Sequence, residues 1–110
     1  KADGSLDWQK TIDGARYASC LHHTKDGGYI VSGMNALDNH GGEDFWIAKL
    51  SPTADIQWEK TLGGTGDEVL RGVDQCDDGS FIAAGFTNST DGDVIGNHGM
   101  NDAWVVKLKP

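Results

Sequence analysis

The sequence predicts an all-β fold built from two similar repeats, and three observations support this prediction. The 110-residue chain contains three pairs of matching segments, which are 6–12 with 56–62, 26–33 with 78–85, and 39–52 with 97–110. Each repeat holds short runs rich in valine, isoleucine, threonine and aromatic residues, which are typical of strands. Glycine and aspartate separate these runs and favour tight turns between them.

Matching residues, which we call counterparts, are 50 positions apart in the first pair of segments, 52 in the second and 58 in the third. The additional residues fall in loops, so the chain divides into repeat 1 (about 1–50) and repeat 2 (about 51–110). The predicted strands are 6–12, 16–23, 28–35 and 44–50 in the first repeat and 56–62, 68–75, 80–87 and 102–108 in the second.

Four antiparallel strands in a repeat of this length are typical of one blade of a β-propeller. The predicted fold is therefore a β-propeller of two four-stranded blades, as part of a larger ring or of an oligomeric ring, with less than about 5% helix. A β-sandwich and a β-solenoid are the alternatives. A sandwich has little reason to repeat its sequence every four strands, and solenoid repeats are usually shorter.

Three segments of the second repeat carry a resemblance to a known family: TLGGTGD at 61–67, DGSFIAAGFTNS at 78–89 and DAWVVKL at 102–108. With these motifs, the chain resembles the seven-bladed β-propeller repeats of bacteria and archaea (SBBP type) over both repeats. Repeat 1 departs from the pattern at residues 12–15, where Ile-Asp-Gly-Ala replaces the glycine pair. The resemblance implies an extracellular or cell-surface location, no single shared activity and no catalytic residues to transfer.

The resemblance also implies an order of strands within each blade. The outermost strand of the first blade would be 56–62, paired with 44–50, and strand 102–108 would lack an outer partner. Two blades cannot close a ring, so the expected partners are further blades of the same chain or copies of it. A chain that exists alone is expected to form a closed ring of roughly three or four copies, in which strand 6–12 completes a neighbour's blade.

Composition argues against two classes of partner. The formal net charge of −8 would repel a phosphate backbone, so no nucleic acid is expected to bind. The apolar runs are far shorter than the roughly 18–20 residues that span a bilayer, so no membrane insertion is expected. We expect Cys20 and Cys76 to be small buried residues rather than a disulfide, because the repeat places them at non-equivalent heights.

The four tryptophans form two pairs of counterparts, Trp8 with Trp58 and Trp46 with Trp104. They are candidate ligand-binding residues, because indole faces stack well on sugar rings. The alternative, which we favour, is packing between blades, because a repeated core needs a large ring at the same place in each repeat. The predicted strand pairing also sets Lys49 across from Trp58, in position for a cation–π contact.

Residues 91–102 match part of a calcium-binding loop, with acidic residues at its first, third and twelfth positions (Asp91, Asp93 and Asp102) and glycine at its sixth. Ile95 at the fifth position offers no side-chain ligand, and repeat 1 lacks counterparts of the first two acids. The alternative is a surface turn rich in aspartate and glycine, so no cofactor is expected, with calcium as the open possibility.

No arrangement of residues predicts catalysis: there is no Gly-x-Ser-x-Gly elbow, no phosphate-binding glycine loop, and the carboxylates are scattered through turns. The sequence therefore predicts a non-enzymatic, secreted or cell-surface propeller module that acts as a scaffold or as a protein-interaction or adhesion unit. Its partner would be a cell-surface protein. The alternative is a lectin-like propeller, formed by oligomerisation, that binds a glycan.

Overall fold

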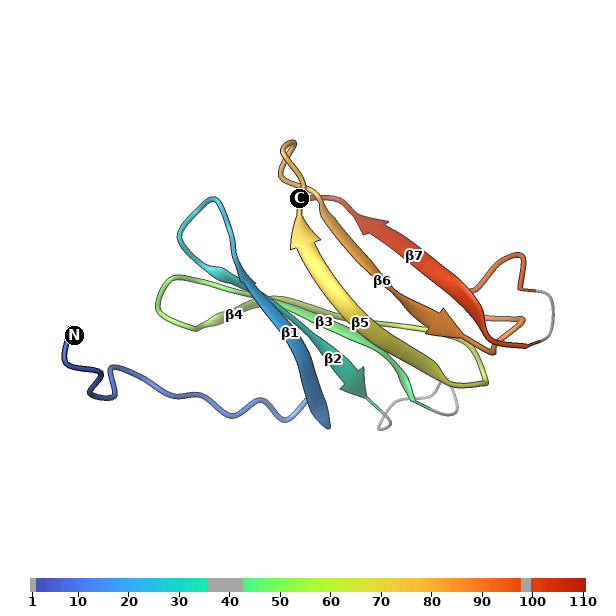
Figure 1. Cartoon of the computed structure of the whole chain (residues 1–110), viewed down its shortest axis with the longest axis horizontal. Helices are drawn as coiled ribbons and strands as arrows, with labels where there is room; N and C mark the ends of the chain where they lie inside the picture. The colour runs from blue at the N-terminus through green and yellow to red at the C-terminus, as the bar shows by residue number, and fades with distance from the viewer. Residues whose placement is uncertain (1, 36–42, 98–99) are drawn as a thin grey trace.

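The computed structural model describes residues 2–35, 43–97 and 100–110, which form two antiparallel sheets (Figure 1). This part of the chain contains no helix, and so none long and apolar enough to cross a membrane. The strands are β1 (Tyr17–His23), β2 (Tyr29–Asn35), β3 (Asp44–Leu50), β4 (Ile56–Leu62), β5 (Glu68–Gln75), β6 (Phe81–Thr87) and β7 (Asp102–Leu108).

Hairpins connect consecutive strands within each sheet. The β1–β2 and β5–β6 turns each place a glycine at positive φ, Gly27 at 84° and Gly79 at 88°. Glycine adopts this conformation without the steric cost that a Cβ atom would add. The predicted turn signals are confirmed at both places, and the strand boundaries follow from them.

The strand pairing does not follow the boundary between the sequence repeats. The first sheet has the order β1-β2-β3-β4, although β4 belongs to repeat 2, and Lys49 lies opposite Trp58 as predicted. The second sheet has the order β5-β6-β7. In the described chain β7 is therefore an edge strand, which confirms that 102–108 lacks an outer partner.

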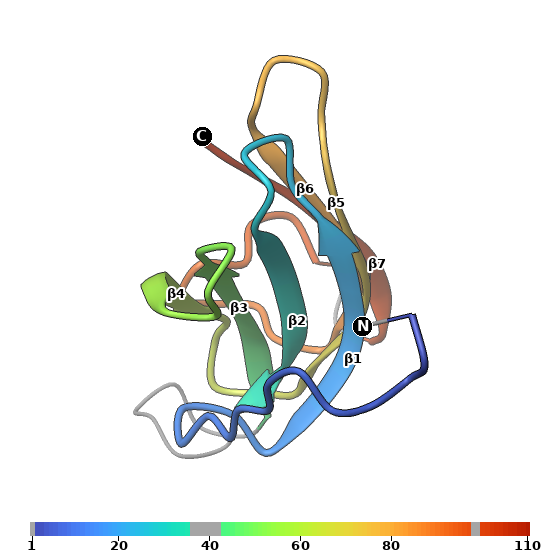
Figure 2. The same ribbon diagram turned by 90° about the vertical axis from the view of Figure 1, so that its left-hand side faces the viewer.

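The prediction of a strand at 6–12 is wrong for the chain as the structure shows it. These residues are extended and mostly exposed, and they take part in neither sheet (Figure 2). The reason is that their counterpart, β4, pairs with the third strand of the preceding repeat, and the described chain has no such strand before residue 6. For the same reason the second sheet has three strands instead of the predicted four.

The two sheets pack face to face, with β5 against β1, β2 and β3 (Figure 1). We call this contact the junction. Ile30, Phe45 and Ile47 of the first sheet are each 0% exposed there. They pack on the second sheet's Leu70, Val73, Phe81 and Ala83, with partly buried residues at the margin.

The junction joins opposite faces of the two sheets. Phe81 and Ala83 of the second sheet pack in it, whereas their counterparts Tyr29 and Val31 lie on the other face of the first sheet, within a separate cluster. The sheets are thus stacked head to tail, since the face that the second sheet uses in the junction corresponds to the face of the first sheet that points away from it.

β1 and β5, the first strands of the two sheets, carry a bulge at the same place. The register shifts between Ala18 and Cys20 in β1 and between Leu70 and Gly72 in β5. Corresponding residues of the two bulges are 52 positions apart, which is the spacing of the second pair of matching segments. The bulge is therefore a feature that the two repeats share.

Candidate functional site

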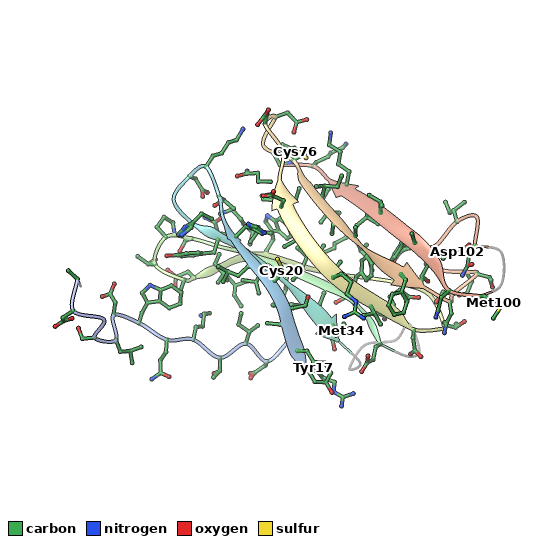
Figure 3. All side chains as sticks on the ribbon, viewed as in Figure 1. Tyr17, Cys20, Met34, Cys76, Met100 and Asp102 are labelled. Atoms are coloured by element: carbon green, nitrogen blue, oxygen red, sulfur yellow. The ribbon has the colours of Figure 1, made fainter. Side chains whose placement is uncertain are left out.

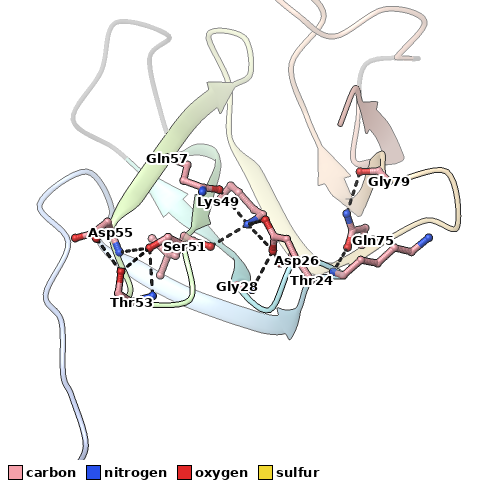
Figure 4. A network of polar contacts seen from close by, with 12 residues as sticks. Thr24, Asp26, Gly28, Lys49, Ser51, Thr53, Asp55, Gln57, Gln75 and Gly79 are labelled. Carbon is pink, nitrogen blue, oxygen red and sulfur yellow. Dashed lines mark hydrogen bonds and ion pairs between the residues drawn. The ribbon is translucent and has the colours of Figure 1, made fainter.

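A cavity of about 300 Å³ opens between the two sheets, where the β1–β2 and β5–β6 turns come together. We call it the inter-sheet cavity. Its lining residues are Lys25, Asp26, Lys49, Gln57, Trp58, Gln75, Gly79, Phe81 and Pro110. The lining combines aromatic and aliphatic surface with amide and charged groups, many of which belong to the polar network drawn in Figure 4.

The ammonium of Lys49 is the centre of this network, although the residue is only 5% exposed. Its Nζ donates to Asp26 Oδ2 at 3.0 Å, to the Leu50 carbonyl at 2.9 Å and to Gln57 Oε1 at 3.1 Å (Figure 4). Three acceptors match the three N–H groups of an ammonium, which is how a protein offsets the cost of burying one. The ammonium is thus held by oxygen acceptors, and the expected cation–π contact with Trp58 is not formed.

Asp26 is the anionic partner of Lys49 and also orders its own turn. Its carboxylate accepts from the Thr24 hydroxyl at 2.5 Å and from the Gly28 N–H at 2.9 Å. These two bonds, followed by the bond from Lys49, hold the pKa of Asp26 well below its ordinary value of 3.8. At neutral pH the turn therefore carries a fixed negative charge.

The second repeat contains a similar but more exposed arrangement, in which Ser80 supplies the hydroxyl. Asp78, the counterpart of Asp26, accepts from the Ser80 hydroxyl at 2.5 Å and from the Ser80 N–H at 2.9 Å. Lys107, the counterpart of Lys49, lies 3.4 Å from its carboxylate. A network that recurs in both repeats is best explained as a device for closing the hairpin.

Acid is expected to weaken this turn. The Ser80 hydroxyl and N–H, with a smaller contribution from Lys107, lower the pKa of Asp78 from 3.8 to about 2. Because the pKa of Asp78 is lower in the folded chain than in the unfolded chain, the ionised carboxyl stabilises the fold fully above pH 3.8. This stabilisation is lost as the pH falls from 3.8 to about 2. Across that range, the Tm of the Asp78→Asn variant should fall less steeply with decreasing pH than the Tm of the unmodified chain. Asp77→Asn, which removes the adjacent carboxyl and leaves the Ser80 bonds in place, should behave like the unmodified chain.

Gln75 connects the turns of the two sheets. Its Oε1 accepts from the Lys25 N–H at 2.7 Å, and its Nε2 donates to the Gly79 carbonyl at 3.1 Å (Figure 4). The Lys25 ammonium also reaches the Asp77 carbonyl in the same loop. These bonds bring the β1–β2 turn beside the β5–β6 turn and so form one wall of the inter-sheet cavity.

The four tryptophans lie in separate places. Trp46 is 1% exposed and donates its indole N–H to Glu59 Oε1 at 2.9 Å. Trp104 packs on Phe45 across the junction, with ring centroids 4.7 Å apart. Trp58 is the tryptophan that lines the inter-sheet cavity, where its ring meets Phe81.

Trp8 contacts Tyr29 on the first sheet and is 42% exposed. The structure therefore does not combine the four rings into one platform, and each has its own packing contact.

The three acids of the predicted calcium loop serve different parts of the structure. Asp91 accepts hydrogen bonds from the Thr65 N–H at 2.9 Å and from the Thr65 hydroxyl. These two bonds hold the pKa of Asp91 below 3.8. Asp93 accepts from the Gly63 N–H at 3.0 Å. Asp102 begins β7 (Figure 3). Within the described ranges, no group of three or more histidine, cysteine, aspartate or glutamate side chains could hold a metal ion.

Calcium is expected to leave Tm unchanged, because the carboxylates of Asp91 and Asp93 already accept hydrogen bonds from the 63–65 turn. Thermal unfolding with and without millimolar calcium, together with proteolysis of the 88–101 loop, tests this expectation. A rise in Tm with calcium that is absent from the Asp91→Asn variant would establish the metal site instead.

Glu68 is a structural residue that the sequence analysis missed. It is 0% exposed, and its carboxylate accepts from the Gly64 N–H at 3.0 Å, from the Thr87 hydroxyl at 2.6 Å and from the Ser89 hydroxyl. The signal that could have revealed it is a glutamate directly after the glycine-rich turn, at the start of a predicted strand. It joins that turn to the end of β6.

The cysteines are both free thiols, as expected, but both are partly exposed, so the expectation that they are buried is wrong. Cys20 lies within β1, and Cys76 lies beyond the end of β5 in the other sheet (Figure 3).

No protein-family model matches this chain, and no curated protein is significantly similar to it in sequence.

Proposed function

We propose that the two sheets are blades of a β-propeller and that the chain is a non-enzymatic scaffold or interaction module at the cell surface. The head-to-tail stacking of the sheets supports the propeller, because propeller blades are repeated four-stranded sheets stacked around an axis. The cell-surface location rests on the family resemblance of the sequence.

The observation that carries this proposal is a difference in burial between counterparts. Ile30 and Ile47 are 0% exposed because the second sheet covers them, whereas their counterparts Ile82 and Val105 are 39% and 60% exposed. An exposed apolar face that is core in the other repeat is a surface for a partner. The same face lines an open, mostly apolar depression of about 280 Å³.

Hydrogen bonding of the carboxylates supports a non-catalytic role. Asp26, Asp78 and Asp91 accept hydrogen bonds from their own or a neighbouring turn. Lowered carboxyl pKa values with such causes are typical of turn structure, whereas general acid–base catalysis needs pKa values near the working pH.

Glycan binding is the second candidate, and the inter-sheet cavity favours it. Trp58 supplies an aromatic surface, and the side chains of Asp26 and Gln57 stand beside it. Aromatic rings flanked by carboxylate and amide groups are suited to the apolar faces and hydroxyls of sugars.

A glycan array decides between the two candidates. The scaffold function predicts no glycan above background. A bound glycan whose affinity falls at least tenfold in Trp58→Leu would replace the scaffold function with the lectin. Trp104→Leu is the matched control, because it also removes a tryptophan from the junction but lies outside the inter-sheet cavity.

A further inference from the structure

We propose that residues 6–12 are the fourth strand of the second sheet in a neighbouring copy of this chain, and that copies associate head to tail through this strand and the two outward sheet faces. This inference rests on the proposed propeller architecture and names the partner as a second copy. Four observations support it.

The first observation is the position of Trp8. Its ring meets Tyr29 with centroids 5.6 Å apart and an interplanar angle of 63°. The counterpart rings, Trp58 and Phe81, meet at 5.7 Å and 67°. Trp58 belongs to β4, the outermost strand of the first sheet, and Phe81 belongs to the second sheet. The N-terminal segment therefore contacts the first sheet as an outermost strand contacts the sheet that follows it.

The second observation comes from the other end of the segment. Ile12 packs on the outward face of the first sheet, against the cluster that contains Val31 and Trp46. Its counterpart Leu62, at the end of β4, packs against the buried cluster of the junction. Residues 6–12 thus already lie where the outermost strand of a preceding sheet would lie, but without that sheet.

The third observation is the open edge of β7. In the first sheet, β3 pairs with β4 so that Ile47 faces Lys60 and Lys49 faces Trp58. The same pairing between two copies would place Val105 of one copy opposite Lys10 of the other, and Lys107 opposite Trp8. The segments that meet in this way have the same sequence pattern, so the ladder that closes the first sheet can also close the second.

The fourth observation is a space left on the first sheet. A depression of about 210 Å³ is bordered by Ala18, Val31 and Trp46 on the sheet and by the N-terminal segment. The counterparts of these three residues, Leu70, Ala83 and Trp104, contact the junction cluster to which Phe45 and Ile47 belong.

In a second copy, the residues that correspond to Phe45 and Ile47 are Ala103 and Val105. The exposed Val105 face would therefore enter this depression. Leu21, which is 52% exposed, would be covered by the same contact, as its counterpart Val73 is at 4%.

A second copy is the occupant that these observations select. Its β7 edge and its Val105 face are placed relative to each other as the matching edge and face of the first sheet are placed in the junction. The contact is heterologous, since different surfaces of the two copies meet, and such contacts give a ring where the rotation between copies closes and an open filament where it does not. Propellers with roughly six to eight sheets correspond to three or four copies of this two-sheet chain.

Cysteine crosslinking tests the strand pairing. In a Cys20→Ala, Cys76→Ala background, the pair Lys10→Cys and Val105→Cys would place two Cβ atoms directly opposite each other across copies, within reach of a disulfide. Mild oxidation is expected to give an intermolecular 10–105 disulfide, which peptide mapping identifies. The matched control pairs Gln9→Cys with Val105→Cys, since a shift of one residue moves the side chain to the other face.

Native mass spectrometry and light scattering test the assembly itself. The expected mass is three or four times the 11.8 kDa of one chain. Val105→Glu should raise the dissociation constant at least tenfold, whereas Ile95→Glu, at a loop residue that is 91% exposed, should leave it unchanged.

A folded monomer at the highest concentration at which the chain stays in solution, or an oligomer that lacks the 10–105 disulfide, overturns this inference. Either result leaves the scaffold function standing, because the glycan array tests that function separately. A mass that changes with Ile95→Glu and not with Val105→Glu also overturns it.

Discussion

Replacing Phe45 with alanine is expected to lower the free energy of unfolding by about 3–5 kcal/mol. Phe45 is 0% exposed at the junction and packs on Trp104, so its removal leaves a cavity between two sheets that hold each other in place. Small domains have a total stability of about 5–15 kcal/mol, so this loss would remove a large share of it.

Urea unfolding followed by tryptophan fluorescence measures this loss, because Trp104 reports directly on the packing of residue 45. Ile95→Ala is the control, since that side chain is 91% exposed and its truncation should change stability by less than about 0.5 kcal/mol. Similar urea midpoints for the two variants would show that the sheets do not depend on the junction.

Replacing Glu68 with alanine is expected to cost about 3 kcal/mol or more, because three buried donors lose their acceptor. The Gly64 N–H cannot turn to another partner, whereas the Thr87 and Ser89 hydroxyls can rotate. Glu68→Gln keeps one carbonyl oxygen and nearly the same volume, so its cost should be about half as large.

Chemical denaturation of Glu68→Ala and Glu68→Gln distinguishes a hydrogen-bonding role from a simple volume effect. Glu59→Ala is a useful comparison, because Glu59 accepts a hydrogen bond from Trp46 but is itself exposed. Equal losses in the two Glu68 variants would contradict the role assigned to the carboxylate, and a loss below about 0.5 kcal/mol in both would show that it is not needed.

Much of the fold could be predicted from the sequence, because the turns carry strong signals. The observed bounds of β3, β4, β5 and β7 coincide with the predicted ranges, and those of β1, β2 and β6 differ by one residue at the start. The β1–β2 and β5–β6 turns each combine a glycine at positive φ with an aspartate that caps the turn, and these residues are recognisable in a single sequence.

The failures concern interactions between segments that are distant in the chain. Residues 6–12 have the sequence pattern of β4, but a strand also needs a neighbour to pair with, and sequence periodicity does not supply one. Glu68 was missed for a related reason. Its partners at 64, 87 and 89 come together only when β5 and β6 pair.

The candidate site was foreseen only in part. Trp58 and Lys49 were expected to lie opposite each other, and they do. The buried network around Lys49 was not foreseen, because it depends on Asp26, which is 23 residues earlier in the chain and reaches Lys49 only through the pairing of β2 with β3.

The position of β4 has a consequence for how such a gene could change in length. Because β4, the first strand of repeat 2, completes the sheet of repeat 1, the chain at 62–68 leads directly from the first sheet into the second. Unequal recombination between repeats would therefore add or delete one whole unit and still leave each internal sheet with an outer strand from the unit that follows. A gene with this offset can vary its number of units in single steps without passing through an intermediate in which an internal sheet is broken.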